Sequence, residues 1–500
     1  MENKTLNDFG MRISGLRFQK DGRKQKTSDF SFLTFFLLLT LYVSPFTREL
    51  KAQSLDDYLI QAAENNPGLQ AAYARYEASL ERVKQPGLPD PELQAGFFFK
   101  PMERFMGNQQ ADLQLMQMFP WFGMIGSQKE EANQMALAQY QLFLEEKNQL
   151  LFQVKSTWYE LFRLNEEIRI SKENLEFLKK YERLALIKLQ AAAPGSSGAT
   201  PATASPASPT PTSSAAGSSA MSSMSSNPTQ MAPSSSSMSS GMGASSGSGM
   251  GDVLQIRIEM KELENNIALL EANVEPLQIK FNQLLNREIK EAIAIAESLQ
   301  PVALEVEKLA ILDSIKSNNP MLAMYDFEMA ALDQQARMAK LDGRPMLGAG
   351  VNYMPFTARM EDGMSMGGED MIMPMVTMTL PIYRKKTQSR IKEAEYLKEA
   401  AFLNRQKTEN LLAMEWANAF RDWEDAERKI SLYSEQTDLV NQNLQLQLTA
   451  YSNSGQDFEE VLRTQQRLLD YQLRRINAIN QQYQSLAMLE MLASTDFNHQ

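Results

Sequence analysis

The chain has 500 residues, of which 43% are apolar and 22% charged, and its formal net charge is -11 at pH 7. It contains no cysteine, and its single histidine, His499, is the penultimate residue. Disulfides and thiolate metal sites are therefore excluded, and histidine acid–base catalysis has almost no residues to use. The negative charge disfavours nucleic acid, because phosphate groups repel an acidic surface. This composition predicts a protein that is not an enzyme and binds no cofactor.

Residues 1–52 have the pattern of a secretory signal segment. Six basic side chains within residues 12–26 precede an apolar run at residues 30–43, and Ala52 supplies a small residue for cleavage. The apolar run, about 14 residues long, is too short for a membrane-spanning helix, which needs about 20. We therefore expect export with cleavage near Ala52, rather than a transmembrane anchor.

The rest of the chain contains one pattern twice, in residues 53–300 and 301–495, and ends in a tail at 496–500. Four segments correspond in the same order: Asn65-Asn66-Pro67 with Asn318-Asn319-Pro320, Phe119-Pro120-Trp121 with Leu380-Pro381-Ile382, Trp158 with Trp416, and Asp252-Val253-Leu254 with Glu460-Val461-Leu462. The spacing falls at the last pair, because the first repeat carries an insertion at 191–250. This insertion is rich in serine, glycine, proline and methionine and is expected to be disordered.

Each repeat is predicted to contain a short helix, two strands and two long helices, a mainly α fold with a small β part. Repeat one is expected to have strands at about 91–100 and 111–120 and long helices at about 125–190 and 252–286. The corresponding elements of repeat two are strands at about 346–354 and 371–381 and helices at about 386–451 and 457–493.

Apolar residues spaced by three and four predict a coiled-coil-like seam on the first long helix of each repeat. In repeat two the seam includes Trp416, Ala419, Trp423, Ala426, Ile430, Tyr433, Thr437, Val440, Leu444, Gln447 and Tyr451. In repeat one it includes Leu151, Val154, Trp158 and Leu161, and continues with polar interruptions through Asn165, Ile168, Lys172 and Leu175.

The strands alternate between two kinds of residue. In the segment 376–380, Val376, Met378 and Leu380 are expected on one face and Thr377 and Thr379 on the other. Strands of this length can cross a membrane when tilted, but four cannot close a barrel, and an open edge in lipid is unstable. Either the strands lie in water, or several chains each donate four strands. A trimer would have twelve.

This layout resembles the TolC-type outer-membrane efflux factors, through the paired Asn-Pro segments, the two strand-to-helix corners and the two segments beginning at Asp252 and Glu460. The resemblance implies a homotrimer in which a twelve-stranded outer-membrane β-barrel continues into a periplasmic α-helical barrel. It also implies contact with outer-membrane lipid and docking to a periplasmic adaptor protein and an inner-membrane RND-type pump. The expected location is the outer membrane, with a long periplasmic extension.

The resemblance also indicates a periplasmic gate. Acidic side chains commonly ring the narrow end of these tubes, and the matching positions here are Asp252 and Glu460. A ring of carboxylates favours cations. The alternative is an ordinary helix start, since acidic residues are stabilised near helix N-termini. Gln255 and Arg463 stand where a second acidic ring could occur, so a double ring is not expected.

Methionine is abundant, with 31 residues. Several lie close together: Met364, Met366, Met371, Met373 and Met375. Thioethers are soft ligands that select Cu(I), and Ag(I) by the same argument, so these residues are candidates for transient soft-metal contacts. In this the chain resembles the copper- and silver-exporting, CusC-like subgroup of the family. The alternative is that methionine serves as a flexible apolar filler.

Together with these observations, the resemblance implies the exit duct of a tripartite efflux system, passive and driven by an inner-membrane pump, with Cu(I) or Ag(I) as candidate cargo. The alternative from another class is a periplasmic coiled-coil tether or adaptor without a channel. A metal-buffering protein that binds Cu(I) through residues 191–250 is a third interpretation.

Overall fold

The structure is a computed structural model that describes residues 54–192, 248–295, 299–304, 306–361, 363–454 and 458–497. The predicted signal segment and most of the predicted insertion lie outside these ranges, as do residues 498–500 of the predicted tail. Both helices that flank the insertion extend into the range 191–250. At the first of these ends the helix continues through Ala191 and Ala192, because alanine is the strongest helix former.

The chain is mainly helical with a small sheet, as predicted. Repeat one contains α3 (Leu55–Asn65), α4 (Pro67–Lys84), β1 (Glu92–Arg104), β2 (Gly107–Phe119), α5 (Met124–Ala192) and α6 (Ser248–Leu284). Repeat two contains α7 (Lys308–Asn318), α8 (Pro320–Asp342), β3 (Met346–Met354), β7 (Met371–Thr379), α9 (Arg384–Ser454) and α10 (Phe458–Ala493). Three short strands separate β3 from β7: β4 (Phe356–Thr357), β5 (Arg359–Glu361) and β6 (Met364–Met366).

The helix that opens each repeat, predicted as one short helix, is broken in two at the Asn-Pro step. Proline disfavours helical geometry in the residue before it and fits the first helical position. Asn66 therefore caps α4, accepting hydrogen bonds from the backbone N–H groups of Gly68 and Leu69, and Asn319 caps α8 through Met321.

The same two asparagines show that the repeats are related in three dimensions. Asn66 Nδ2 donates to the carbonyl of Leu284 at the end of α6, at 2.9 Å. Asn319 Nδ2 donates to the carbonyl of Leu492, near the end of α10, at 3.1 Å. Each cap thus fastens the start of its repeat to that repeat's last helix. The residue that ends the last helix of each repeat is also similar in conformation: Asn286, just after α6, has a φ of 52°, and Ser494, just after α10, has a φ of 53°.

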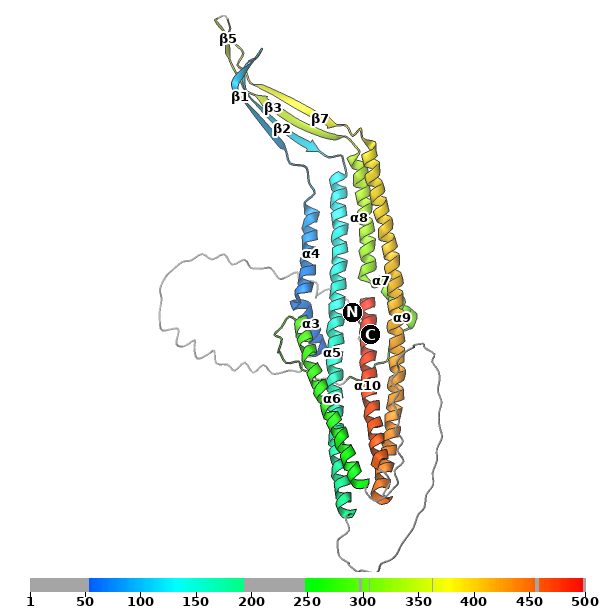
Figure 1. The fold of residues 1–500 in the computed structure, drawn as a ribbon. Coiled ribbons are helices and arrows are strands. Elements are labelled where there is room, and N and C mark those ends of the chain that lie inside the picture. Colours follow the sequence, from blue (N-terminus) through cyan, green and yellow to red (C-terminus); the bar gives the residue numbers. More distant parts are fainter. Residues whose placement is uncertain are drawn as a thin grey trace, which may run out of the picture. The chain divides into compact units, whose positions relative to one another are not determined.

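The helices pack side by side, and the sheet continues from one end of them (Figure 1). Helix α5 packs against α4, α6, α8 and α10, and α9 packs against α8 and α10. The predicted seam of α9 is buried or half-buried throughout. On α5 the predicted seam is wrong at Asn165 and Lys172, which are exposed, whereas Ile168 and Leu175 are half-buried. The buried positions on this part of α5 include Leu164, Glu167, Ser171, Asn174 and Leu178. The packed face of α5 therefore contains polar residues and is offset from the predicted seam. No helix within the described ranges has the length and hydropathy needed to span a bilayer.

The first strand pair is longer than predicted. The expected loop between residues 100 and 111 is mostly strand, and β1 turns into β2 through Phe105 and Met106. Gly107, which begins β2, has a φ of +120° that other residues rarely adopt. Pro101 would interrupt a central strand, but β1 is an edge strand and its register shifts between Phe97 and Met102.

Candidate functional site

The four long strands form one antiparallel sheet in the order β1-β2-β3-β7, so each repeat contributes one pair. Residues directly opposite one another in neighbouring strands lie on the same face. The register aligns Leu115 with Leu93 and Val351, and it aligns Met116 with Glu92 and Gly350. The sheet therefore has two faces of different chemistry.

One face, here called the apolar face, carries a continuous set of exposed apolar side chains. They are Leu93, Phe97, Leu115, Phe119, Leu347, Val351, Ile372, Val376 and Met378. Val376 has the most exposed of these side chains, at 84%. An exposed apolar surface of this kind marks contact with another apolar phase or partner.

The opposite face, here called the methionine face, carries Met371, Met373 and Met375 together with Thr377. The ladder between β3 and β7 continues past Pro374 without a bulge, with Val351 opposite Pro374 and Asn352 opposite Met373. The predicted alternation therefore holds along β7, and the three methionines share a face. Asp112, Gln114 and Asn352 add polar groups to it.

The other two candidate metal ligands, Met364 and Met366, lie elsewhere. Both belong to β6, which pairs with β5 in a separate two-stranded sheet. Their side chains are exposed. The structure therefore does not bring them onto the methionine face.

Two residues of the methionine face were missed by the sequence reasoning. Met116 and Met118 of β2 lie opposite Gly350 and Gly348 of β3. Gln117 interrupts the alternation of β2, because it stands in the apolar row between Leu115 and Phe119. Its amide donates to the carbonyl of Pro89 at 2.7 Å and is thereby satisfied. Without Gln117, the period of two would have placed both methionines on this face.

The ends of the long helices meet in one apolar cluster, here called the tip cluster. Its buried members include Tyr181, Val253, Ile256, Tyr451, Phe458, Val461 and Leu462. Asp252 is half-buried and Glu460 is exposed beside this cluster, so the two candidate gate residues come to the same end of the helices. Burial raises the pKa of Tyr451, and the nearby Asp252 carboxylate raises it further. Glu459 pairs with Arg463 at 2.8 Å.

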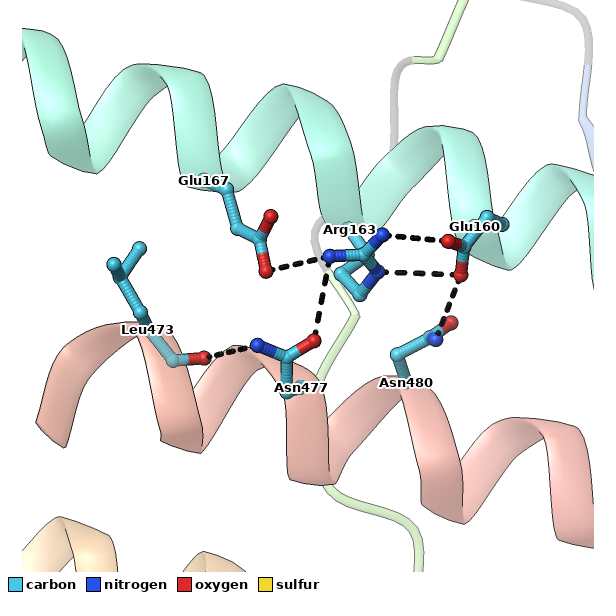
Figure 2. Close-up of polar contacts among 6 residues, drawn as sticks. All are labelled: Glu160, Arg163, Glu167, Leu473, Asn477 and Asn480. Atoms are coloured by element: carbon cyan, nitrogen blue, oxygen red, sulfur yellow. Dashed lines mark hydrogen bonds and ion pairs between the residues drawn. The ribbon is translucent and has the colours of Figure 1, made fainter. Parts of the chain in front are cut away.

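Farther along α5, a polar network joins it to α10 (Figure 2). Arg163 bonds Glu160 at 2.5 Å and Glu167 at 2.6 Å, and it also donates to Asn477 of α10 at 3.3 Å. Asn480 of α10 donates to Glu160 at 3.2 Å. Hydrogen bonding from Arg163 is the main cause that lowers the pKa of Glu160. The network fixes the register of α10 on α5.

An ion pair between α5 and α10 is buried. Lys155 Nζ lies 2.7 Å from Glu490 Oε2, with side-chain exposures of 13% and 7%. Burial raises the pKa of Glu490 to about 7, although Lys155 acts in the opposite direction. The backbone N–H of Phe497 also donates to Glu490, at 3.3 Å.

The sequence and the fold were compared with those of known proteins. Residues 311–494 match the family model described as outer membrane efflux protein. No curated protein matches the chain significantly in sequence.

Solved structures match the chain over nearly its whole length. They include the outer-membrane channel OprN (14% identity, TM-score 0.63, 89% of this chain and 90% of that one). VceC, an outer membrane protein of Vibrio cholerae, is 13% identical with a TM-score of 0.63, over 89% of this chain and 96% of its own. CusC is 11% identical with a TM-score of 0.63, over 88% and 91%. Residues 311–494, most of the second repeat, thus match the outer membrane efflux protein family, and the chain has the fold of the solved channels.

Proposed function

We propose that this protein is the outer-membrane exit duct of a tripartite efflux system. Three copies would complete a twelve-stranded barrel in the outer membrane and a periplasmic tube of helices below it. The duct is passive, and an inner-membrane pump of the RND type drives transport through a periplasmic adaptor. It performs no catalysis.

The observation that carries this proposal is the two-faced sheet. Its apolar face is exposed in the single chain, and its edges, β1 and β7, offer unpaired backbone groups to neighbours. In a closed barrel of identical chains, β1 of one chain would pair with β7 of the next, and lipid would cover the apolar face. A periplasmic tether would gain nothing from an exposed apolar face of this extent.

As cargo we propose a soft monovalent cation, Cu(I) or Ag(I). The support is the methionine face, whose thioethers would line the interior of the barrel. Deleting the gene should make cells several-fold more sensitive to copper and silver salts while changing their tolerance of dyes and detergents much less. Equal sensitisation to all of these compounds would argue for a general duct instead.

The gate proposal concerns the exposed Glu460 and the half-buried Asp252, which lie at the same end of the helices. Three copies of Glu460 around one axis would form a carboxylate ring that favours cations. Purified protein in planar bilayers should conduct, and E460Q should lower the cation-to-anion permeability ratio severalfold, because three charges leave the narrowest region.

The control for this experiment is E459Q. Glu459 is the neighbouring acid, and Arg463 already neutralises it, so its removal should change the permeability ratio little. Equal effects of E459Q and E460Q would contradict the gate, and absence of conductance in the unmodified protein would contradict the duct.

A further inference from the structure

Strand β3 forms a bare strip across the methionine face, because Gly348 and Gly350 have no side chains to cover it. Gly350 lies opposite Met116 of β2 on one side and Met375 of β7 on the other. Neighbouring strands lie about 4.8 Å apart, so the backbones of β2 and β7 are about 10 Å apart across this strip. Long, flexible side chains from the two strands can meet above it.

Two thioethers of β2 already lie over the strip. A Cβ atom on Gly348 would stand 2.6 Å from Met118 Sδ and 3.4 Å from Met116 Sδ. A Cβ atom on Gly350 would stand 3.0 Å from Met116 Sδ. Both sulfur atoms therefore lie near one point above β3, in space that any larger residue would occupy.

The contact with β7 is also present. Thr377 Oγ1 donates to Met116 Sδ at 3.9 Å, so the Met116 side chain spans β3 and reaches β7. Met375 lies two residues before Thr377 on the same face of β7. Met375 of repeat two thus lies opposite Gly350 on the face where the two thioethers of repeat one cover the strip.

We infer that Met116, Met118 and Met375 form a soft-cation site above the glycine strip of each chain, and that it takes Cu(I) or Ag(I). Uncharged thioethers bind soft monovalent ions in preference to hard cations, which prefer oxygen ligands. The inference rests on the proposed cargo and deepens it, since Met116 and Met118 lie in repeat one and were not among the candidates. If methionine served only as a filler, leucine would replace it without consequence.

The test uses the full-length protein purified in detergent, with Ag(I) alone as the probe in titration calorimetry. M116L/M118L removes both sulfur atoms but keeps an apolar side chain of similar volume. It should weaken Ag(I) binding at least tenfold. M375L should weaken it as well, and it tests the site even if the double variant fails to assemble. M378L is the matched control, because Met378 lies on the same strand but on the apolar face, and its affinity should not change.

Every protein in this series has the same methionines in residues 193–247, so they cannot produce the difference. Unchanged Ag(I) affinity in M116L/M118L or in M375L, or an equal loss in M378L, would overturn the inference. Conductance in potassium chloride is measured on the same samples. If all of the variants conduct and bind Ag(I) equally, the site fails and the duct stands. If the unmodified protein does not conduct, the duct fails whatever the Ag(I) result.

Discussion

Replacing Lys155 with methionine should destabilise the protein by up to about 2 kcal/mol at pH 8.5, because the substitution leaves the buried Glu490 carboxylate without its cation. The pair is 2.7 Å apart and nearly inaccessible to water. Methionine fills the space of the lysine stem, so the loss reports the charge rather than a cavity. Unfolding is followed by circular dichroism on purified protein in detergent.

The effect should depend on pH in a defined direction. Burial raises the pKa of Glu490 in the folded protein to about 7 from an ordinary value of 4.5. Between these values the folded state binds more protons than the unfolded state, so stability falls as pH rises through about 7. Removing Lys155 raises this pKa further, since Lys155 lowers it in the native protein. K155M should therefore lose much less stability at about pH 5, where the carboxyl is protonated, than at about pH 8.5.

The control is K172M, on the same helix. Lys172 pairs with Glu271 of α6 at 2.6 Å, but both side chains are about half exposed. An exposed pair of this kind contributes at most about 1 kcal/mol. The double variant K155M/E490Q should recover most of the stability lost in K155M. Equal stability of K155M and K172M at both pH values would contradict this account of the buried pair.

Most of the helices and strands could be predicted from the sequence because the same pattern occurs twice. Some of the positions that correspond between the repeats are ones where backbone geometry restricts the residue, such as Asn66 and Asn319, whose side chains also bond to the last helix of each repeat. The strand pairs could be predicted because one face of each strand is apolar. Local features of this kind can be predicted from the sequence alone.

What could not be predicted depends on contacts between distant segments. The burial of Glu167, Ser171 and Asn174 on α5 depends on which helices cover them, so a seam drawn from apolar spacing failed there. The role of Met116 and Met118 depends on the glycines of β3, more than 200 residues away in sequence. For the candidate site, the sequence could identify the shared face of β7 but not the residues of β2 that complete it.

Replacing Val376 with arginine should abolish assembly in the outer membrane, and this result separates the duct from a periplasmic tether. Val376 lies on the apolar face, and its side chain is 84% exposed in the single chain. If that face contacts lipid, each arginine costs about 2–4 kcal/mol near the bilayer midplane, and a trimer carries three of them. A tether in water would tolerate the same change, because exposed surface substitutions usually alter stability by less than about 0.5 kcal/mol.

The matched control is T377R, one residue along the same strand. Thr377 lies on the methionine face, which would contact water inside the barrel, so T377R should still reach the outer membrane as a heat-sensitive trimer. The measurement is the amount of trimer in detergent-requiring outer-membrane fractions, seen on gels with and without heating. V376R and T377R differ only in the face that carries the charge, so a loss confined to V376R assigns the apolar face to lipid. Normal assembly of V376R, or release of the unmodified protein by salt alone, would favour the tether.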